Sequence, residues 1–391
     1  MTLCTYSKTW VTVDLNNRSV GACCRTPQHD VATDIDINDE WFTSLRNNLD
    51  NGIQDERCHV CWHQDKTIGT SLRHYGPALK DEKVHLLSSG KAELQYLEIR
   101  LGNQCDGACV YCGGEFSAKQ AKFWKLHLDI PKPDTKEPLI EETKRLIEEN
   151  KHSLNTIVFI GGEPSIMERW YDFIEFISNI TFEQSLSVVI TTNASWTDKT
   201  KQRLFAAVDK FLTGSSHTFN IRISGEGNEE YFNGIRKFTD YQRVLNNIND
   251  TAAKFGNRIS YMLQPVLNGL SVYSLGDWID KFDAIFTTNN ISDVRIHFAL
   301  LTRPNEFQTM HQGKMAVPAI DKLIQLIQAS KSYKGKRDSI KLLENQRSKL
   351  VDTEPDKVML AKLSRLLAAH DTILPNDWKS EDALSPIKHT L

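Results

Sequence analysis

The 391-residue chain lacks the features that mark membrane and secreted proteins. No segment reaches the run of roughly 20 apolar residues that a membrane-spanning helix needs. The N-terminal residues MTLCTYSKTW have neither the basic stretch nor the apolar core of a secretory signal. Proline is scarce, with 12 residues, and the 40% hydrophobic content is that of an ordinary globular protein rather than a disordered or fibrous one. We therefore expect a cytoplasmic protein that does not bind membranes.

The chain also lacks an excess of positive charge. Its 47 Lys and Arg residues are balanced by 50 Asp and Glu residues, which gives a formal net charge of -3. Binding to the phosphate backbone of nucleic acids depends on a clear excess of clustered Lys and Arg. The charge balance therefore argues against general nucleic-acid binding.

Cysteine, in contrast, is present in an informative pattern. All eight cysteines lie in the first third of the chain. Structural disulfides are rare in the reducing cytoplasm, where grouped cysteines more often bind metals or take part in redox chemistry. The groups are Cys4, the pair Cys23 and Cys24, the pair Cys58 and Cys61, and the triplet Cys105, Cys109 and Cys112.

The middle of the chain alternates between strand-like and amphipathic helical segments. This alternation predicts an α/β fold with a buried parallel sheet, and six units fit a partial (β/α)6 TIM-like barrel better than a closed barrel of eight. In such folds the active site is built from loops at the C-terminal ends of the strands. The six predicted strands are residues 94–101, 154–160, 185–192, 218–224, 259–267 and 294–301.

The segments on either side of the barrel differ from it in pattern. Residues 1–85 are rich in loops and cysteine, with a hairpin predicted around Asn16-Asn17 and a helix over 41–49. We expect a small N-terminal module there, a barrel over 90–305, and a helical C-terminal extension over 306–391. No functional motif is evident in the extension.

The first barrel strand is followed by the segment LGNQCDGACVYCGG, which places Cys105, Cys109 and Cys112 in a C-x3-C-x2-C pattern. A 4Fe-4S cluster normally has four cysteine ligands, so three close cysteines leave one iron open for chemistry. Zinc is the alternative, because short-spaced cysteines also form tetrahedral zinc sites. The second cysteine pair that such zinc sites usually have is absent after Cys112.

The second barrel strand ends in the turn Gly161-Gly162-Glu163-Pro164. Two glycines allow the backbone to approach a ligand closely, and the Glu163 carboxylate can accept hydrogen bonds from an ammonium group. Alone, the segment is equally typical of an ordinary strand-to-helix turn with an acidic residue near the helix N-terminus. Its position one strand after the cysteine triplet favours a shared site.

Together, the two motifs resemble those of the radical S-adenosylmethionine (SAM) superfamily. The resemblance implies a 4Fe-4S cluster on the cysteine triplet whose open iron binds the amino and carboxylate groups of SAM. One electron from the reduced cluster then cleaves SAM to methionine and a 5′-deoxyadenosyl radical, which abstracts hydrogen from a substrate. It also implies a protein electron donor such as flavodoxin or ferredoxin.

The same resemblance assigns cofactor-binding roles along the chain. The Gly161–Pro164 turn would hold the methionine amino group, chiefly through Glu163 and the backbone of Gly161 and Gly162, and Tyr111 would lie near the adenine. Thr192 and Asn193 would lie near the ribose and methionine. Ser224 would contact the ribose and Arg236 the carboxylate. The alternatives for the last two are a turn serine and a solvated surface arginine, and Glu226 stands where many relatives have aspartate.

The N-terminal cysteines resemble those of twitch or SPASM modules, which bind auxiliary iron–sulfur clusters. The resemblance implies a second 4Fe-4S cluster, with Cys23 as an alternate ligand. Structural zinc is the competing assignment, because His59 and His63 lie nearby in the sequence. The predicted ligands are Cys4, Cys24, Cys58 and Cys61.

These features predict a radical SAM enzyme of oxidoreductase or maturase type that modifies a peptide or protein side chain. Modification of a small molecule or nucleotide is the first alternative, and a zinc-stabilised, non-catalytic binding protein is the second. Hydrogen abstraction by a radical requires no protein acid or base, so we predict no catalytic side chain. Candidate substrate contacts on the later strands are Arg222, Gln264, Asn268, Arg295 and His297.

Overall fold

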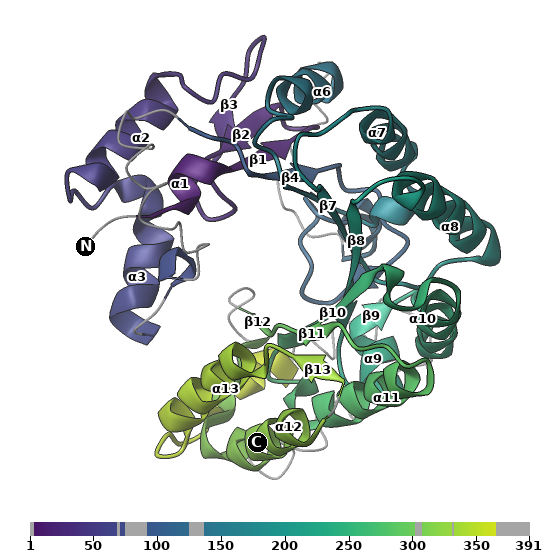
Figure 1. Ribbon diagram of the computed structural model, residues 1–391. Helices are drawn as coiled ribbons and strands as arrows, with labels where there is room; N and C mark the ends of the chain where they lie inside the picture. The colour runs from purple at the N-terminus through teal and green to yellow at the C-terminus, as the bar shows by residue number, and fades with distance from the viewer. Residues whose placement is uncertain are drawn as a thin grey trace.

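The computed structural model describes residues 4–68, 71–74, 92–124, 137–301, 307–330 and 332–364. Its centre is an 11-stranded, largely parallel sheet that curves into an open arc, with helices along the convex side (Figure 1). The predicted α/β fold with a partial barrel is confirmed. Among the described helices, none is long and apolar enough to cross a membrane.

All six predicted barrel strands are present, and each pairs in parallel with its neighbour in the arc. A two-residue strand, β12 (Ala299–Leu300), also pairs with β10. The six strands are β4 (Tyr96–Arg100), β6 (Thr156–Ile160), β7 (Ser187–Thr192), β8 (Thr218–Gly225), β10 (Ser260–Leu267) and β11 (Val294–Ile296).

The helices that connect these strands lie outside the arc (Figure 1). Their starts are fixed by capping side chains: Thr197 accepts a hydrogen bond from the backbone of Thr200, and Asp240 accepts one from Arg243. Each helix buries one apolar face against the sheet. The helices are α6 (Ile140–Glu149), α7 (Glu168–Ser178), α8 (Asp198–Leu212), α10 (Tyr241–Phe255) and α11 (Leu275–Thr288).

The two faces of the sheet differ in character. The odd-numbered residues of β6 and β8 pack against the helices, as shown by Phe159 and Phe219, whose rings contact Trp170 of α7 with centroids 6.4 and 6.5 Å apart. Along β8 and β10 the even-numbered residues are less buried than the odd-numbered ones. Because side chains alternate along a strand, the even-numbered residues line the concave side of the arc, called the lumen below.

The N-terminal segment extends the same sheet. Strand β1 (Trp10–Asp14) pairs in parallel with β4, and the predicted hairpin is confirmed by its antiparallel pairing with β2 (Ser19–Gly21). The pairing of β2 with β3 (His29–Asp30) completes this edge. The remaining N-terminal elements are α1 (Tyr6–Thr9), α2 (Glu40–Asp50), η1 (Glu56–Cys58), α3 (His59–Ile68) and η2 (Leu72–His74).

The C-terminal region is largely helical, as predicted, but it also adds a strand. Strand β13 (Tyr333–Lys334) pairs in parallel with β11 at the other end of the sheet. It lies between α12 (Val317–Ala329) and α13 (Lys336–Leu350), and it follows the 3-10 segment η8 (Thr309–Ala316). Two residues are too few to show a strand period, so the sequence pattern gave no sign of β13.

The remaining elements surround the C-terminal ends of the barrel strands. A separate two-stranded sheet pairs β5 (Ala108–Cys109) with β9 (Arg236–Lys237). The others are α5 (Ala118–Trp124), η4 (Pro164–Ile166), α9 (Glu229–Ile235), η5 (Gly256–Arg258) and η6 (Ser271–Tyr273).

Candidate active site

The cysteine triplet lies in the loop that follows β4, and all three thiols are partly buried. The Cys112 amide donates to the Cys109 carbonyl over 3.1 Å, and the Gly107 amide donates to the Cys105 sulfur over 3.4 Å. Burial is the main cause that raises the pKa of Cys109 to about 11 and that of Cys112 to about 12, and the neighbouring Cys109 raises the latter further. Thiolates at these positions therefore require a compensating cation.

The Gly161–Pro164 turn packs directly against this cysteine loop. The Glu163 amide donates to the Gln104 carbonyl over 2.9 Å. Gly162 has a φ of +53°, and a Cβ at this position would lie 2.1 Å from the same carbonyl oxygen. Only glycine therefore allows this contact between the turn and the loop.

The Glu163 carboxylate is buried and holds the end of β7 in place. Oε1 accepts hydrogen bonds from Ser165 Oγ (2.6 Å) and Thr192 Oγ1 (2.7 Å), and Oε2 accepts one from the Asn193 amide (2.7 Å). Burial is the main cause that raises the pKa of Glu163 to about 7, and the Asp106 carboxylate adds to the effect. The side chain thus joins the end of β6 to the end of β7.

Asn193 extends this connection to the cysteine loop. Its side-chain amide donates to Asp106 Oδ1 over 2.7 Å, and Asp106 lies between Cys105 and Cys109 in the sequence. The sequence analysis did not select Asp106. Its position inside the C-x3-C motif was the available signal, because an acidic residue between metal ligands rarely lacks a partner.

A second buried carboxylate supports the other end of the loop. Glu226 is fully buried, and it accepts hydrogen bonds from the Tyr111 hydroxyl and the Arg236 guanidinium, the latter from Nη2 over 2.9 Å. Arg236 is directly opposite Cys109 in the β5–β9 pair. With 6% exposure Arg236 is not a solvated surface residue, so that alternative is wrong.

Comparison with known proteins shows what the segment that carries this site is similar to. The sequence model described as the Radical SAM superfamily matches residues 99–265, a segment that starts in β4 and ends in β10. This segment makes up less than half of the chain, and its sequence is similar to the radical SAM superfamily. The matched segment contains the cysteine triplet, the Gly161–Pro164 turn and the Glu226–Arg236 pair.

Several solved structures resemble the chain at low identity, while a search of curated proteins found no match. Streptococcus suis SuiB bound to precursor peptide SuiA is 12% identical, with a TM-score of 0.42, over 74% of this chain and 64% of SuiB. SuiB bound to S-adenosylmethionine is 14% identical, with a TM-score of 0.39, over 75% of this chain and 59% of SuiB. TYW1 with a lysine-pyruvate adduct is 14% identical, with a TM-score of 0.33, over 61% of this chain and 72% of TYW1. The chain therefore spans less than two thirds of either SuiB chain.

The other residues that the sequence analysis assigned to cofactor or substrate occupy different environments. Ser224 lies within β8 rather than in a turn, and it pairs in register with Gln264 on the lumen side. Asn268 is fully buried and holds the turn after β10, where its Oδ1 accepts from the backbone of Leu270 (2.9 Å) and Ser271 (3.0 Å). Asn268 therefore fixes this turn, and its role as a substrate contact stays a prediction.

The last two substrate candidates lie on or beside β11, and both are exposed. Arg295 forms a loose ion pair with Asp293 over 3.8 Å. Because their side chains already contact solvent, neither Arg295 nor His297 is preorganised for substrate binding.

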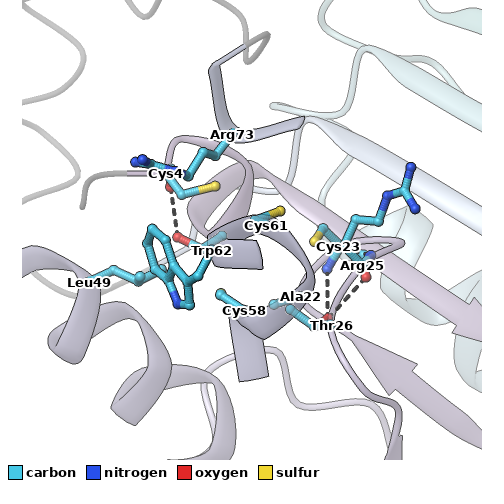
Figure 2. Close-up of a pocket in the computed structure, with 11 residues that line it drawn as sticks. Cys4, Ala22, Cys23, Arg25, Thr26, Leu49, Cys58, Cys61, Trp62 and Arg73 are labelled. Carbon is cyan, nitrogen blue, oxygen red and sulfur yellow. Dashed lines mark hydrogen bonds between the residues drawn. The ribbon is translucent and has the colours of Figure 1, made fainter. Parts of the chain in front are cut away.

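Four N-terminal cysteines surround a second pocket, shown in Figure 2. They are Cys4, Cys23, Cys58 and Cys61, and the pocket also includes Arg25 and Arg73. Cys23 is the alternate ligand of the sequence analysis, whereas Cys24 is exposed and is not among the lining residues. Burial is the main cause that raises the pKa of Cys23 to about 11 and that of Cys58 to about 12, and the other thiols add to it.

The chemistry of both cysteine groups suits iron–sulfur ligation. Backbone amides donate to the sulfur atoms of Cys23 and Cys105, each over 3.4 Å, as is common for thiolates that bind clusters. His59 and His63 do not line the N-terminal pocket. Within the described residues, no three Cys, His, Asp or Glu side chains converge on a single-ion site.

Proposed function

We propose that this radical SAM enzyme cleaves S-adenosylmethionine reductively and abstracts hydrogen from a peptide or protein side chain. The observation that carries the proposal is the fixation of the cysteine loop by two buried carboxylates, Glu163 through Asn193 and Glu226 through Tyr111. When bound, a 4Fe-4S cluster supplies the electron that cleaves SAM. Cys105, Cys109 and Cys112 would hold it.

The residues of the chain would bind and orient SAM next to that cluster. Within the described residues, Glu163 Oε2 accepts from the Asn193 amide alone, so it has capacity for a further donor such as the SAM ammonium group. The backbone of Gly161 and Gly162 would lie on the same side, and Thr192 and Ser224 would contact the ribose. We assign Tyr111 to the adenine of SAM and Arg236 to its carboxylate, because Glu226 holds both side chains in place.

We further propose that the N-terminal pocket holds a second 4Fe-4S cluster on Cys4, Cys23, Cys58 and Cys61. Four cysteines around one pocket, two of them buried and two partly buried, would supply a complete ligand set, with Cys23 in place of Cys24. Structural zinc is the competing occupant, since it accepts the same four thiolates. Arg25 and Arg73 line the pocket and would offset part of the negative charge of a four-thiolate cluster.

A peptide substrate is favoured by the lumen and by the N-terminal cysteine segment, which resembles the modules of peptide-modifying radical enzymes. The polar side chains of β4 and β8 face the lumen and can bind polar groups of a substrate. An electron donor of the flavodoxin or ferredoxin type would reduce the cluster. The non-catalytic alternative does not account for the presence of both the cysteine loop and the Gly161–Pro164 turn in one packed site.

Anaerobic reconstitution with iron and sulfide, followed by dithionite and SAM, tests the proposed function. We expect the wild type to form 5′-deoxyadenosine and methionine, and Cys109→Ala to form neither. Cys24→Ala is the matched control, because Cys24 is exposed and lines neither cysteine site. A wild-type protein with a spectroscopically confirmed cluster that yields no 5′-deoxyadenosine would contradict the proposal.

A further inference from the structure

Glu98 on β4 and Arg222 on β8 both face the lumen. Glu98 is opposite Val158 of β6 in register, and the next residue of β6, Phe159, packs against the helices on the other face. Arg222 alternates with the buried Ile221 and Ile223 in the same way. The two side chains therefore approach each other across the concave side of the sheet.

Glu98 is largely buried, with 6% exposure, and its carboxylate has no hydrogen-bond donor among the described residues. Burial is the main cause that raises its pKa to about 7, and the cations that oppose this effect are Arg222, Arg100 and Arg25, in that order. A largely buried carboxylate without protein donors is costly, and it remains available to a donor that enters the lumen.

Arg222 and its neighbour Thr191 are also incompletely bonded. Arg222 lies near the Tyr96 hydroxyl, whose pKa burial raises and the Arg222 charge partly lowers, and the Arg222 Nε is buried without a partner in the described part of the chain. The Thr191 hydroxyl, which is opposite Arg222 in the β7–β8 register, likewise has no partner within the described ranges. Glu98, Thr191 and Arg222 form a patch of polar groups with bonding capacity left, called the lumen floor below.

The lumen floor contrasts with a second buried acid–base pair of the same residue types. Glu226 and Arg236 bond to each other, and Glu226 also bonds to the Tyr111 hydroxyl. The two opposite charges of this pair therefore already compensate each other within the protein. Glu98 and Arg222 keep bonding capacity directed into the lumen, beneath the strand ends where the cysteine loop lies.

We propose that the lumen floor binds an amide group of the substrate, with the amide N–H donated to Glu98 and the amide oxygen accepting from Arg222. This inference rests on the proposed function and specifies its substrate class as a peptide backbone or a side-chain carboxamide. The two floor charges cancel, so a neutral group with a donor and an acceptor satisfies both without burying a net charge. A lone carboxylate or ammonium would satisfy one floor residue and leave the other unpaired.

Thermal unfolding of the reconstituted protein tests whether the floor is unsatisfied. The adjacent residues Thr191 and Thr192 give a matched pair, because the Thr192 hydroxyl donates to Glu163 and accepts from the Ala194 amide. We expect Thr191→Val and Glu98→Gln to raise the midpoint by about 2 °C, and Thr192→Val and Glu226→Gln to lower it. If Thr191→Val and Glu98→Gln lower the midpoint as their controls do, the floor is structural and the proposal is overturned.

Calorimetric titration of the SAM-loaded enzyme tests the ligand class. The probe is N-acetylglycine N-methylamide, with acetate and methylammonium as the singly charged alternatives. We expect saturable binding of the amide that weakens about tenfold in Arg222→Met, which removes the donor to the amide oxygen. Preferential binding of acetate or methylammonium, or no binding of the amide, would overturn the proposal. Formation of 5′-deoxyadenosine by the wild type, measured separately, reports on the proposed function alone.

Discussion

Asn193 donates a 2.7 Å hydrogen bond from its side chain to Asp106, inside the cysteine loop. Its backbone amide donates to Glu163 at the same distance. One residue at the end of β7 therefore joins the carboxylate of the Gly161–Pro164 turn to the loop that would hold the cluster. Groups that orient metal ligands from the next layer commonly change affinity or activity 10- to 100-fold when they are replaced.

Replacement of Asn193 by Asp tests this connection. The variant places a third carboxylate beside Asp106 and Glu163, and like charges at this spacing repel one another. We expect SAM affinity to fall by about 10- to 100-fold, measured from the change that SAM causes in the electron paramagnetic resonance spectrum of the reduced cluster. Asn179→Asp at the exposed C-terminal end of α7 is the control, and its affinity should match that of the wild type. Equal SAM affinities of Asn193→Asp and Asn179→Asp would show that Asn193 does not contribute to SAM binding.

Glu226→Gln is expected to destabilise the protein strongly. The change leaves the buried Arg236 cation without its partner, and breaking a buried ion pair from one side costs about 3 kcal/mol or more. Urea denaturation followed by circular dichroism measures the difference in unfolding free energy. The exposed pair Glu168–Arg203 gives the control, because water solvates both of its charges and Glu168→Gln should have no measurable effect. Similar stability of the two variants would show that Arg236 finds another partner.

Much of this site was predictable from the sequence because its parts are local. The cysteine triplet and the Gly161–Pro164 turn are short motifs, and each follows an apolar run that is long enough to predict a strand. The Tyr111–Glu226 contact was not predictable, since 115 residues separate its partners and only the curvature of the sheet brings them together. For the same reason, the sequence alone allowed Arg236 to be a solvated surface residue, whereas the structure buries it.

The choice between Cys23 and Cys24 depended on backbone geometry that the sequence does not encode locally. Strand β2 ends at Gly21, so the alternation of side chains along a strand does not extend to these cysteines. They lie in a turn that Thr26 closes, and its hydroxyl both accepts from the Cys23 amide (3.2 Å) and donates to the Cys23 carbonyl (3.0 Å). This turn directs Cys23 into the pocket.

Metal analysis of two serine variants tests that assignment. If Cys23 is the ligand, Cys23→Ser should reduce the iron content from about eight to about four atoms per chain, and Cys24→Ser should leave it near eight. Iron and acid-labile sulfide are measured together after anaerobic reconstitution. A loss of iron in Cys24→Ser alone would restore the original assignment. One zinc ion per chain beside about four irons would replace the second cluster by a structural zinc site.

The buried Glu98 carboxylate predicts a defined pH dependence of stability. Its pKa is raised by burial to about 7 in the folded protein, above the value of an exposed glutamate. The stability that protonation contributes is therefore complete at pH values below the unfolded pKa and is lost as the pH rises through 7. We expect Glu98→Gln to match the wild type at pH 4.5 and to exceed its unfolding free energy by about 3 kcal/mol at pH 8. A difference between the two proteins that does not change with pH would show that Glu98 is solvated or paired.

Gly162→Ala tests whether the turn and the cysteine loop must touch. Its φ of +53° is unfavourable for alanine, and the added Cβ would lie 2.1 Å from the Gln104 carbonyl oxygen. Because that oxygen belongs to the backbone, the clash can be relieved only by moving the loop itself. We expect reconstitution to leave the site on Cys105, Cys109 and Cys112 with less iron, while the N-terminal site fills normally. Gly214→Ala, also at positive φ but with no atom within 4 Å of the added Cβ, separates backbone strain from the clash. An equal loss of iron in both variants would attribute the effect to strain, and an undiminished iron content in Gly162→Ala would show that the cysteine loop assembles without this contact.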